Sequence, residues 1–190
     1  MRERFGDKTW ALPILRQIAA GLAELHAHGI VHRDLKPANV LLAEGPDGHG
    51  AIAKISDFGI SRLGASGDRG DARSGEKDDA SAAAPTTDLT QTGALLGTPL
   101  YMAPEAWVEP ARHPSADIFS FGILAHESLS GRPPFAAPPI LLTRSGKPLP
   151  DPPPLDAVSD HVASMVLACL RKEPGSRPSA DAILDAIRAA

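Results

Sequence analysis

The feature that most constrains this chain is a pair of polar motifs on either side of a predicted β-hairpin. Residues 32–39 are His-Arg-Asp-Leu-Lys-Pro-Ala-Asn, and residues 57–59 are Asp-Phe-Gly. Between these motifs, two segments that fit short strands are separated by the turn signal Gly-Pro-Asp-Gly at 45–48. Because an antiparallel hairpin returns the chain to the end where it started, we expect Asp57 to lie beside Asn39.

Four side chains of these motifs suit the transfer of a phosphoryl group to a hydroxyl. Asp34 is the candidate base for the hydroxyl proton, and Lys36 is placed to direct its ammonium at the γ-phosphate. Asn39 offers a neutral oxygen and Asp57 an anionic one, and both suit the coordination of Mg²⁺. Two carboxylates in one site are costly without a cation, which also favours a bound metal during turnover.

Composition narrows the class of protein. The 190 residues suffice for one domain with a substantial core, and 43% hydrophobic with 22% charged residues is typical of a globular protein. A net charge of -4 gives no reason to expect nucleic acid or anionic lipid as a partner. The sequence has one cysteine, no apolar run long enough to span a bilayer and no signal peptide. These features predict a cytoplasmic chain, or the cytoplasmic part of a membrane-anchored protein.

The segment before the first motif predicts a long helix over residues 10–28. Five apolar residues recur at helical spacing: Leu12, Leu15, Ala19, Leu22 and Leu25. We expect Thr9 rather than Asp7 as the N-cap, because Pro13 then falls in the first turn. After the first motif, residues 40–42 predict a short buried strand, and residues 52–55 fit the returning strand.

The second half predicts further helices. The run that begins at Asp117 is apolar on nearly all sides, which is typical of a central helix; Ser115 could cap it and Gly131 could end it. Residues 133–154 are rich in proline and predict an irregular segment with one helical turn near Ile140. The final two helices are indicated by Val162, Met165, Val166, Cys169 and Leu170, and by an apolar pattern that follows Ser179. The predicted class is mainly α with one small β-hairpin.

One internal segment departs from this pattern. Residues 64–92 are dominated by Gly, Ser, Ala, Asp and Arg, and they show neither aromatic residues nor a hydrophobic period. Such a stretch buries too little apolar surface to offset the entropy of ordering it. We therefore expect a single domain over residues 1–190 that contains a flexible insert at 64–92.

These motifs resemble the catalytic and metal-binding loops of Ser/Thr protein kinases of the bacterial receptor-like type. The resemblance runs from the helix before residue 32 to the last helix, and Ala103-Pro104-Glu105 matches a further family triplet. Lys36 followed by Pro37 resembles the Ser/Thr pattern rather than the tyrosine-kinase one. The resemblance implies ATP and Mg²⁺ as cofactors, protein substrates, and the fold of the large C-terminal lobe of a kinase.

The resemblance also implies roles for individual residues. Leu41 matches the floor under adenine, and Thr98 matches a substrate-segment residue that bonds near Asp34. Glu105 and Arg177 match an ion pair behind that segment. Two further matches concern the loop itself: the buried carboxylate that holds its backbone is Asp117, and the histidine that packs under Phe58 is His32.

Arg33, directly before Asp34, implies regulation by phosphorylation. An unpaired arginine beside the base attracts a phosphate placed on the activation loop. Thr90 and Thr92 resemble the autophosphorylated threonine pair of bacterial receptor-like kinases, and they lie in the flexible insert. We therefore expect either threonine to be modified when a complete kinase is present.

The 190 residues contain no glycine-rich phosphate loop, no strand lysine of the Val-Ala-Ile-Lys type and no partner glutamate on a preceding helix. The expectation is a C-terminal lobe whose N-terminal lobe is missing from a truncated gene model or is supplied by another chain. Three functions stay open: a Ser/Thr protein kinase, a non-catalytic module that binds kinase partners or substrates, and a small-molecule phosphotransferase. The Lys36 signal and the Glu105–Arg177 pair favour a protein substrate over a small one.

Overall fold

The computed structural model describes residues 1–45, 50–57, 99–107, 113–156 and 158–189. The α-helices within these ranges are α1 (Lys8–Ala27), α2 (Ser115–Ser130), α3 (Pro139–Arg144), α4 (Asp160–Cys169) and α5 (Ala180–Arg188). Strands β1 (Val40–Glu44) and β2 (Ala51–Ile55) form a two-stranded antiparallel sheet. The predicted class, mainly α with one small hairpin, is confirmed. Among the described residues, no helix has both the length and the apolar character needed to cross a bilayer.

Short 3-10 helices join these elements. They are η1 (Arg2–Arg4), η2 (Pro37–Asn39), η4 (Pro99–Tyr101), η5 (Pro104–Trp107) and η6 (Pro174–Ser176). The η2 turn lies directly before β1, and it therefore places the end of the first motif at the base of the hairpin.

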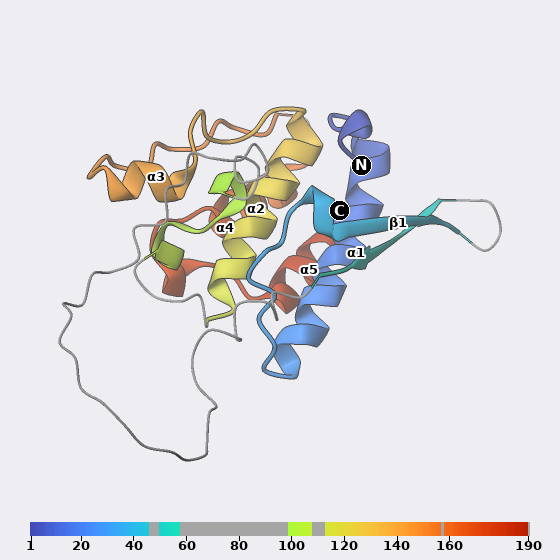
Figure 1. Ribbon diagram of the computed structural model, residues 1–190. Helices are drawn as coiled ribbons and strands as arrows, with labels where there is room; N and C mark the ends of the chain where they lie inside the picture. Colours follow the sequence, from blue (N-terminus) through green and yellow to red (C-terminus); the bar gives the residue numbers. More distant parts are fainter. Residues whose placement is uncertain (46–49, 58–98, 108–112, 157, 190) are drawn as a thin grey trace, which may run out of the picture.

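Helix α2 is the centre of the molecule. Figure 1 shows it in the middle, with α1 on one side and α3 on the other, and α1 and α4 both pack against it. Fourteen of its residues are buried, including Phe119, Phe121 and Leu124, because a helix that is apolar on nearly all sides is stable only when it is covered. It ends as predicted at Gly131, whose φ of 74° is left-handed.

The start of α2 corrects one prediction. Ser115 does not cap the helix but is its first residue. The backbone N–H of Ser115 instead donates to the ring Nδ1 of His113 at 3.2 Å, and the Ser115 hydroxyl lies 2.8 Å from the same nitrogen. The His113 ring thus satisfies the first backbone N–H of the helix, while the N–H groups of Asp117 and Ile118, which a Ser115 cap would serve, donate to the Pro114 carbonyl.

The start of α1 corrects the prediction of its N-cap. The N-cap is Asp7 and not Thr9: the Asp7 carboxylate accepts from the Trp10 backbone N–H at 3.3 Å. It also accepts from the Thr9 hydroxyl at 2.6 Å and from Arg4 at 3.0 Å. The Thr9 and Arg4 donors, followed by the Trp10 N–H, lower the pKa of Asp7 to about 2. Pro13 consequently lies in the second turn, where its missing N–H leaves the Thr9 carbonyl without a helical donor.

The apolar face of α1 is also rotated from the predicted one. The residues that it buries are Ala11, Ile14, Leu15, Ile18, Ala19 and Leu22. Leu12 and Leu25 are only half-buried, whereas Ile14 and Ile18, which the prediction did not include, are inside. The buried face packs on α2 and α5, and a neighbouring stretch of α1 lies against β2.

The two strands of the hairpin form where they were predicted, but β1 is more exposed than predicted. Val40 pairs with Ile55 and Glu44 with Ala51, in an uninterrupted antiparallel register. Of the three residues predicted as a buried strand, only Val40 is buried, while Leu41 is 57% and Leu42 37% exposed. The cause is the order of the layers, because β2 packs on α1 and β1 is the outer strand. The described part of the hairpin extends away from α1 (Figure 1).

The C-terminal helices follow their predicted signals. Ser159 caps α4 by accepting from Val162 N, and Ser179 caps α5 by accepting from Ala182 N. The predicted turn near Ile140 is α3. The prediction that Cys169 is buried is confirmed: its side chain is in the core, where burial raises the pKa of the thiol to about 12.

The contact between α2 and α4 generates a stability prediction. A Cβ on Gly122 would lie 2.8 Å from the Cys169 Cβ and 2.9 Å from the Leu170 Cδ2. We expect Gly122→Ala to lower the free energy of unfolding by about 1–3 kcal/mol through overpacking, although alanine favours a helix by about 1 kcal/mol. Chemical denaturation measures the change. Gly175→Ala is the control because no atom lies within 4 Å of its added Cβ, and equal stability of the two variants would contradict the prediction.

Candidate active site

The loop that carries the first motif is tied to α2 through Asp117. This carboxylate is 1% exposed, and it accepts from the backbone N–H of His32 at 2.8 Å and of Arg33 at 2.7 Å. The His26 ring Nε2 lies 2.9 Å from the same carboxylate. Asp117 also belongs to the first turn of α2, where the helix dipole favours a negative charge. A buried anion is thereby supplied with donors from the loop and from α1.

The polar side chains of the loop converge on Asp34. Lys36 Nζ donates to the Asp34 Oδ2 at 2.8 Å, and Asn39 Nδ2 donates to the same oxygen at 3.1 Å. Asn39 Nδ2 also donates to the Asp34 backbone carbonyl at 2.8 Å, which closes the loop on itself. The Asp34 side chain remains 34% exposed, so the carboxylate is oriented by two donors and is still open to an approaching group.

The second motif returns to this loop through Ser56. The Ser56 N–H donates to the Asn39 carbonyl at 2.9 Å, so Asp57, the next residue, follows directly from the hairpin's base. The Asp34 N–H donates to His32 Nδ1 at 3.3 Å, which leaves Nε2 as the protonated ring nitrogen, donating to the Ser56 carbonyl at 2.9 Å. His32 is fully buried and thus joins the two motifs inside the fold.

Two residues of the site have left-handed backbone conformations. Within the described ranges, Arg33 (φ 70°) and Asp57 (φ 55°) are the non-glycine residues with positive φ. Such conformations cost of order 1–3 kcal/mol each for residues with a side chain, and they persist where surrounding contacts determine them. The Arg33 Nε is moreover buried and has no hydrogen-bond partner in the part of the chain that the structure describes.

The donor set fits a hard divalent cation bound together with phosphate. The Asn39 amide nitrogen is engaged by Asp34, so the amide oxygen is the atom left for a cation. Asp57 is exposed, and its carboxylate accepts only a 3.3 Å bond from the Ser56 hydroxyl among the described contacts. No cluster of three His, Cys, Asp or Glu that could hold a metal occurs in the described residues. One or two protein oxygens together with phosphates and water can hold Mg²⁺.

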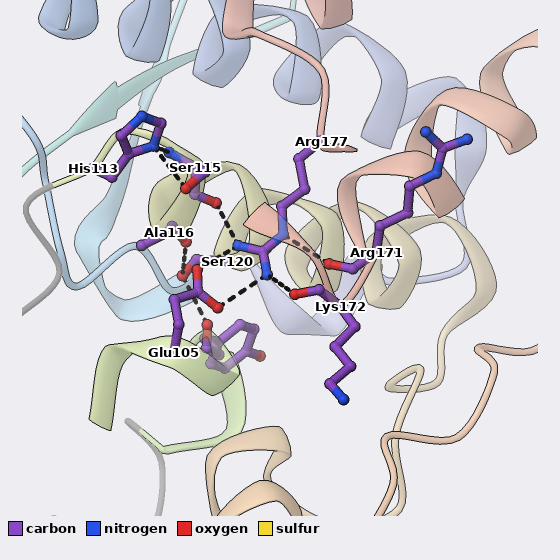
Figure 2. A network of polar contacts seen from close by, with 9 residues as sticks. Glu105, His113, Ser115, Ala116, Ser120, Arg171, Lys172 and Arg177 are labelled. Carbon is purple, nitrogen blue, oxygen red and sulfur yellow. Dashed lines mark hydrogen bonds and ion pairs between the residues drawn. The ribbon is translucent and has the colours of Figure 1, made fainter. Parts of the chain in front are cut away.

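A second buried network is centred on Arg177 (Figure 2). Its guanidinium makes a bidentate ion pair with Glu105 of η5 and donates to the Ser115 carbonyl at 2.9 Å. It also donates to the carbonyls of Arg171 at 2.8 Å and Lys172 at 3.0 Å. The planar, five-donor guanidinium is the side chain that can serve four separate acceptor groups at once. Arg177 therefore joins η5, the start of α2 and the segment after α4.

Tyr101 of η4 is a further junction that no sequence pattern indicated. Its hydroxyl donates to the Glu127 carboxylate and accepts from Arg2 at 2.8 Å, while its carbonyl accepts from the Ser120 hydroxyl at 2.7 Å. Burial and the neighbouring Glu127 carboxylate raise the pKa of Tyr101 above its usual range, so the hydroxyl stays neutral. The network fixes the segment after residue 98 to α2.

The remaining predicted site residues are Leu41 and residues of the segment 58–98. Leu41 lies exposed on the outer strand β1. Thr90, Thr92, Thr98, Phe58 and the insert 64–92 lie outside the described residues, so the predictions for them stay predictions.

His26 is a site residue that sequence reasoning missed. It lies four positions after the buried Leu22 on α1, a spacing that places a polar side chain on the inward face of a helix. That spacing is the one signal that could have marked it. Its partner, Asp117, is 91 residues away, and no local pattern indicates the pairing.

The family model of the protein kinase domain matches residues 3–186, so the chain belongs to the protein kinase family. It is 39% identical over 190 residues to the serine/threonine-protein kinase pkn2 of Myxococcus xanthus, with 95% of this chain covered. It is 36% identical over 173 residues to PkaA of Streptomyces coelicolor and 35% identical over 185 residues to PknA of Mycobacterium tuberculosis, with 90% and 94% of this chain covered.

All three relatives are described as serine/threonine-protein kinases. This chain spans 20% of the length of pkn2, 28% of PkaA and 37% of PknA. The resemblance to bacterial Ser/Thr kinases that the motifs indicated is thereby confirmed at the level of the family.

The Asp117 anchor generates a prediction that requires no catalysis. In Asp117→Asn, the amide NH₂ group must face one of the two backbone N–H groups that the carboxylate now serves. An unsatisfied buried donor costs about 1–3 kcal/mol, so we expect a loss of stability of that size, together with faster hydrogen exchange at His32 and Arg33. Asp160→Asn, on an exposed residue in the first turn of α4, is the control. Unchanged exchange at both loop amides would contradict the anchoring role.

Proposed function

We propose that this chain is the catalytic part of a protein Ser/Thr kinase that transfers the γ-phosphoryl group of ATP to hydroxyl groups of proteins. The observation that carries the proposal is the Asp34 carboxylate, which is oriented by Lys36 Nζ at 2.8 Å and Asn39 Nδ2 at 3.1 Å and remains partly open to solvent. Phosphoryl transfer depends on aligning the nucleophile and matching spreading negative charge. Membership of the protein kinase family supports this chemistry.

Asp34 is the proposed proton acceptor for the substrate hydroxyl. Its geometry suits that role, because an incoming hydroxyl can donate to a carboxylate whose orientation two other donors already fix. Lys36 carries the positive charge nearest this oxygen. When a nucleotide is present, we expect the ammonium to contact the transferred phosphate while it stays within reach of Asp34.

Asn39 and Asp57 are the proposed ligands of Mg²⁺, which would neutralise charge on the nucleotide phosphates. Their relative place is supported by the Ser56–Asn39 backbone bond at 2.9 Å, since Asp57 directly follows Ser56. Leu41, on β1 two residues after Asn39, is the proposed apolar contact for adenine. Its 57% exposure supports a surface that is available for a ligand.

A protein substrate is favoured by the architecture around η4 and η5. The Glu105–Arg177 ion pair and the Tyr101 junction hold residues 99–105 on α2, directly after the position proposed for Thr98. We propose that this segment receives the substrate's Ser or Thr. A small-molecule phosphotransferase needs no such platform, and that alternative is accordingly set aside.

We further propose that the chain forms the large lobe of the kinase. The 190 residues hold no glycine-rich loop and no strand lysine for the α- and β-phosphates, which in a kinase belong to the other lobe. A second candidate function is a non-catalytic module that binds kinase partners or substrates.

The catalytic assignment predicts the outcome of a transfer assay with the purified chain, radiolabelled ATP, Mg²⁺ and a generic basic protein. We expect incorporation well below the roughly 1–100 per second typical of kinases, and a further loss of about a hundredfold or more in Asp34→Asn. Asp57→Asn should weaken the dependence on Mg²⁺. Asp151→Asn, an exposed residue outside the site, should leave incorporation unchanged.

The same assay separates the two candidate functions. Incorporation that survives in Asp34→Asn would show that another group is the base. A wild-type chain that gives no incorporation even when a second polypeptide supplies the glycine-rich loop and strand lysine would favour the interaction module.

Phosphorylation of the insert is a separate prediction. We expect active kinase to carry phosphate at Thr90 or Thr92, because Arg33, beside the base, has a left-handed backbone and a buried Nε that no described residue bonds. Mass spectrometry of active enzyme identifies the modified residue. Active enzyme with both threonines unmodified would reject the proposal, and Arg33→Lys tests the link, since a loss of phosphate-dependent activation is expected.

A further inference from the structure

Gln17 of α1 occupies the free edge of strand β2. Its Nε2 donates to the Ala51 carbonyl at 2.9 Å, and its Oε1 accepts from the Ala53 backbone N–H at 2.9 Å. These two backbone groups point away from β1, because the bonds across the hairpin are made by the alternate residues, as at Gly50 and Ser56. One primary amide therefore takes the place of a neighbouring strand on this side of β2, where the described residues supply none.

The Gln17 amide is itself held in place. Its Nε2 makes a second bond, 3.3 Å long, to the Pro13 carbonyl one turn earlier in α1. The side chain is half-buried, so its two bonds to β2 are partly shielded from water. The amide donates to one backbone group of β2 and accepts from another two residues away, both at 2.9 Å. Together these two bonds specify the position of β2 along α1 and the direction in which it runs.

A second point of contact lies one helical turn further along α1. A Cβ built on Gly21 would be 3.1 Å from the Cδ1 of Ile55, the last residue of β2. The absence of a side chain at residue 21 lets Ile55 pack directly on the helix. Gln17 and Gly21, which are four residues apart on one face of α1, therefore fix the beginning and the end of β2.

The position of β2 matters because the site follows it directly. Ser56, next to Ile55, donates to the Asn39 carbonyl at 2.9 Å, and Asp57 then adopts its left-handed φ of 55°. A two-stranded hairpin alone is at best marginally stable in water, so it cannot by itself sustain that conformation. The required support must come from tertiary contacts, and among the described elements β2 packs closely on α1.

We propose that Gln17 is a positioning residue that sets the place of the Ser56–Asp57 segment relative to Asn39, and through it the geometry of the metal ligands. The metal part of this inference rests on the proposed function, whereas the positional part does not. Gln17 acts through β2 and touches no reacting atom.

The test uses NMR on the full chain labelled with ¹⁵N and with ¹³C-methyl isoleucine. Gln17→Met removes both polar contacts at similar length. We expect the Ala53 and Ser56 amides to exchange about tenfold faster, the change expected when a hydrogen bond of typical strength is lost. The Ile55 methyl resonance and the Asp57 amide resonance should both shift. Arg16→Met, which places the same residue at an adjacent exposed position of α1, should change none of these signals.

Two further variants grade the effect and replace the first if it fails to fold. Gln17→Glu keeps the acceptor for Ala53 N–H but loses the donor to the Ala51 carbonyl, so its exchange rates should lie between those of the wild type and of Gln17→Met. Gln17→Asn keeps the amide but is one methylene shorter and cannot span both groups, so it should behave like Gln17→Met.

Manganese, used as a paramagnetic substitute for Mg²⁺, supplies the functional readout. We expect the Mn²⁺ concentration that half-broadens the Asp57 amide signal to rise about tenfold in Gln17→Met, the lower end of the loss that follows when the support of a metal ligand is removed. Faster exchange at Ala53 with wild-type behaviour of Ser56, Ile55 and Mn²⁺ broadening would overturn the inference, because Gln17 would then only seal the strand edge.

Failure of the proposed function has a different signature. If the wild type and Asp57→Asn respond equally to Mn²⁺, the metal role of Asp57 is wrong. The exchange rate of Ser56 in Gln17→Met then still decides the positional inference, since a wild-type rate overturns it and a faster rate supports it.

Discussion

The hydrogen bonds between Asp117 and the backbone N–H groups of His32 and Arg33 hold the loop of the candidate site in its conformation. A carboxylate that is 1% exposed is costly unless donors surround it, and the loop amides supply those donors. The dependence is mutual, because the loop backbone cannot pair these N–H groups within a regular element. Arg33, which takes a left-handed φ of 70°, is the residue whose strain this pairing offsets.

The site therefore combines rigid anchors with exposed functional atoms. His32 and Asp117 are buried and act as the frame, whereas Asp34 is 34% exposed at its side chain and Asp57 is open to solvent. The two strained residues, Arg33 and Asp57, lie where the buried frame passes into the exposed functional residues. Strain of this kind survives only where several contacts determine it, and the Ser56–Asn39 bond and the β2–α1 packing provide them for Asp57.

Much of this arrangement could be predicted from local sequence. The central helix, the hairpin and the proximity of Asn39 to the second motif followed from apolar runs and one turn signal, because these features act over short distances along the chain. The exposure of Leu41 and Leu42 could not be predicted, since an apolar run does not reveal which strand of a pair faces a helix. The N-cap at Asp7 depended on donors from Thr9 and Arg4, and the roles of His26, Gln17 and Tyr101 depend on partners far away in sequence.

Helix α2 anchors both sides of the candidate site. Asp117 on its first turn holds the loop that carries Asp34, while the Ser115 carbonyl and the Ser120 hydroxyl hold Arg177 and Tyr101, and with them residues 99–105. All of these contacts lie within two turns of one buried helix. A displacement of α2 would move both partners together, so the separation of the candidate base from the candidate substrate segment is set by one rigid element rather than by the packing of several.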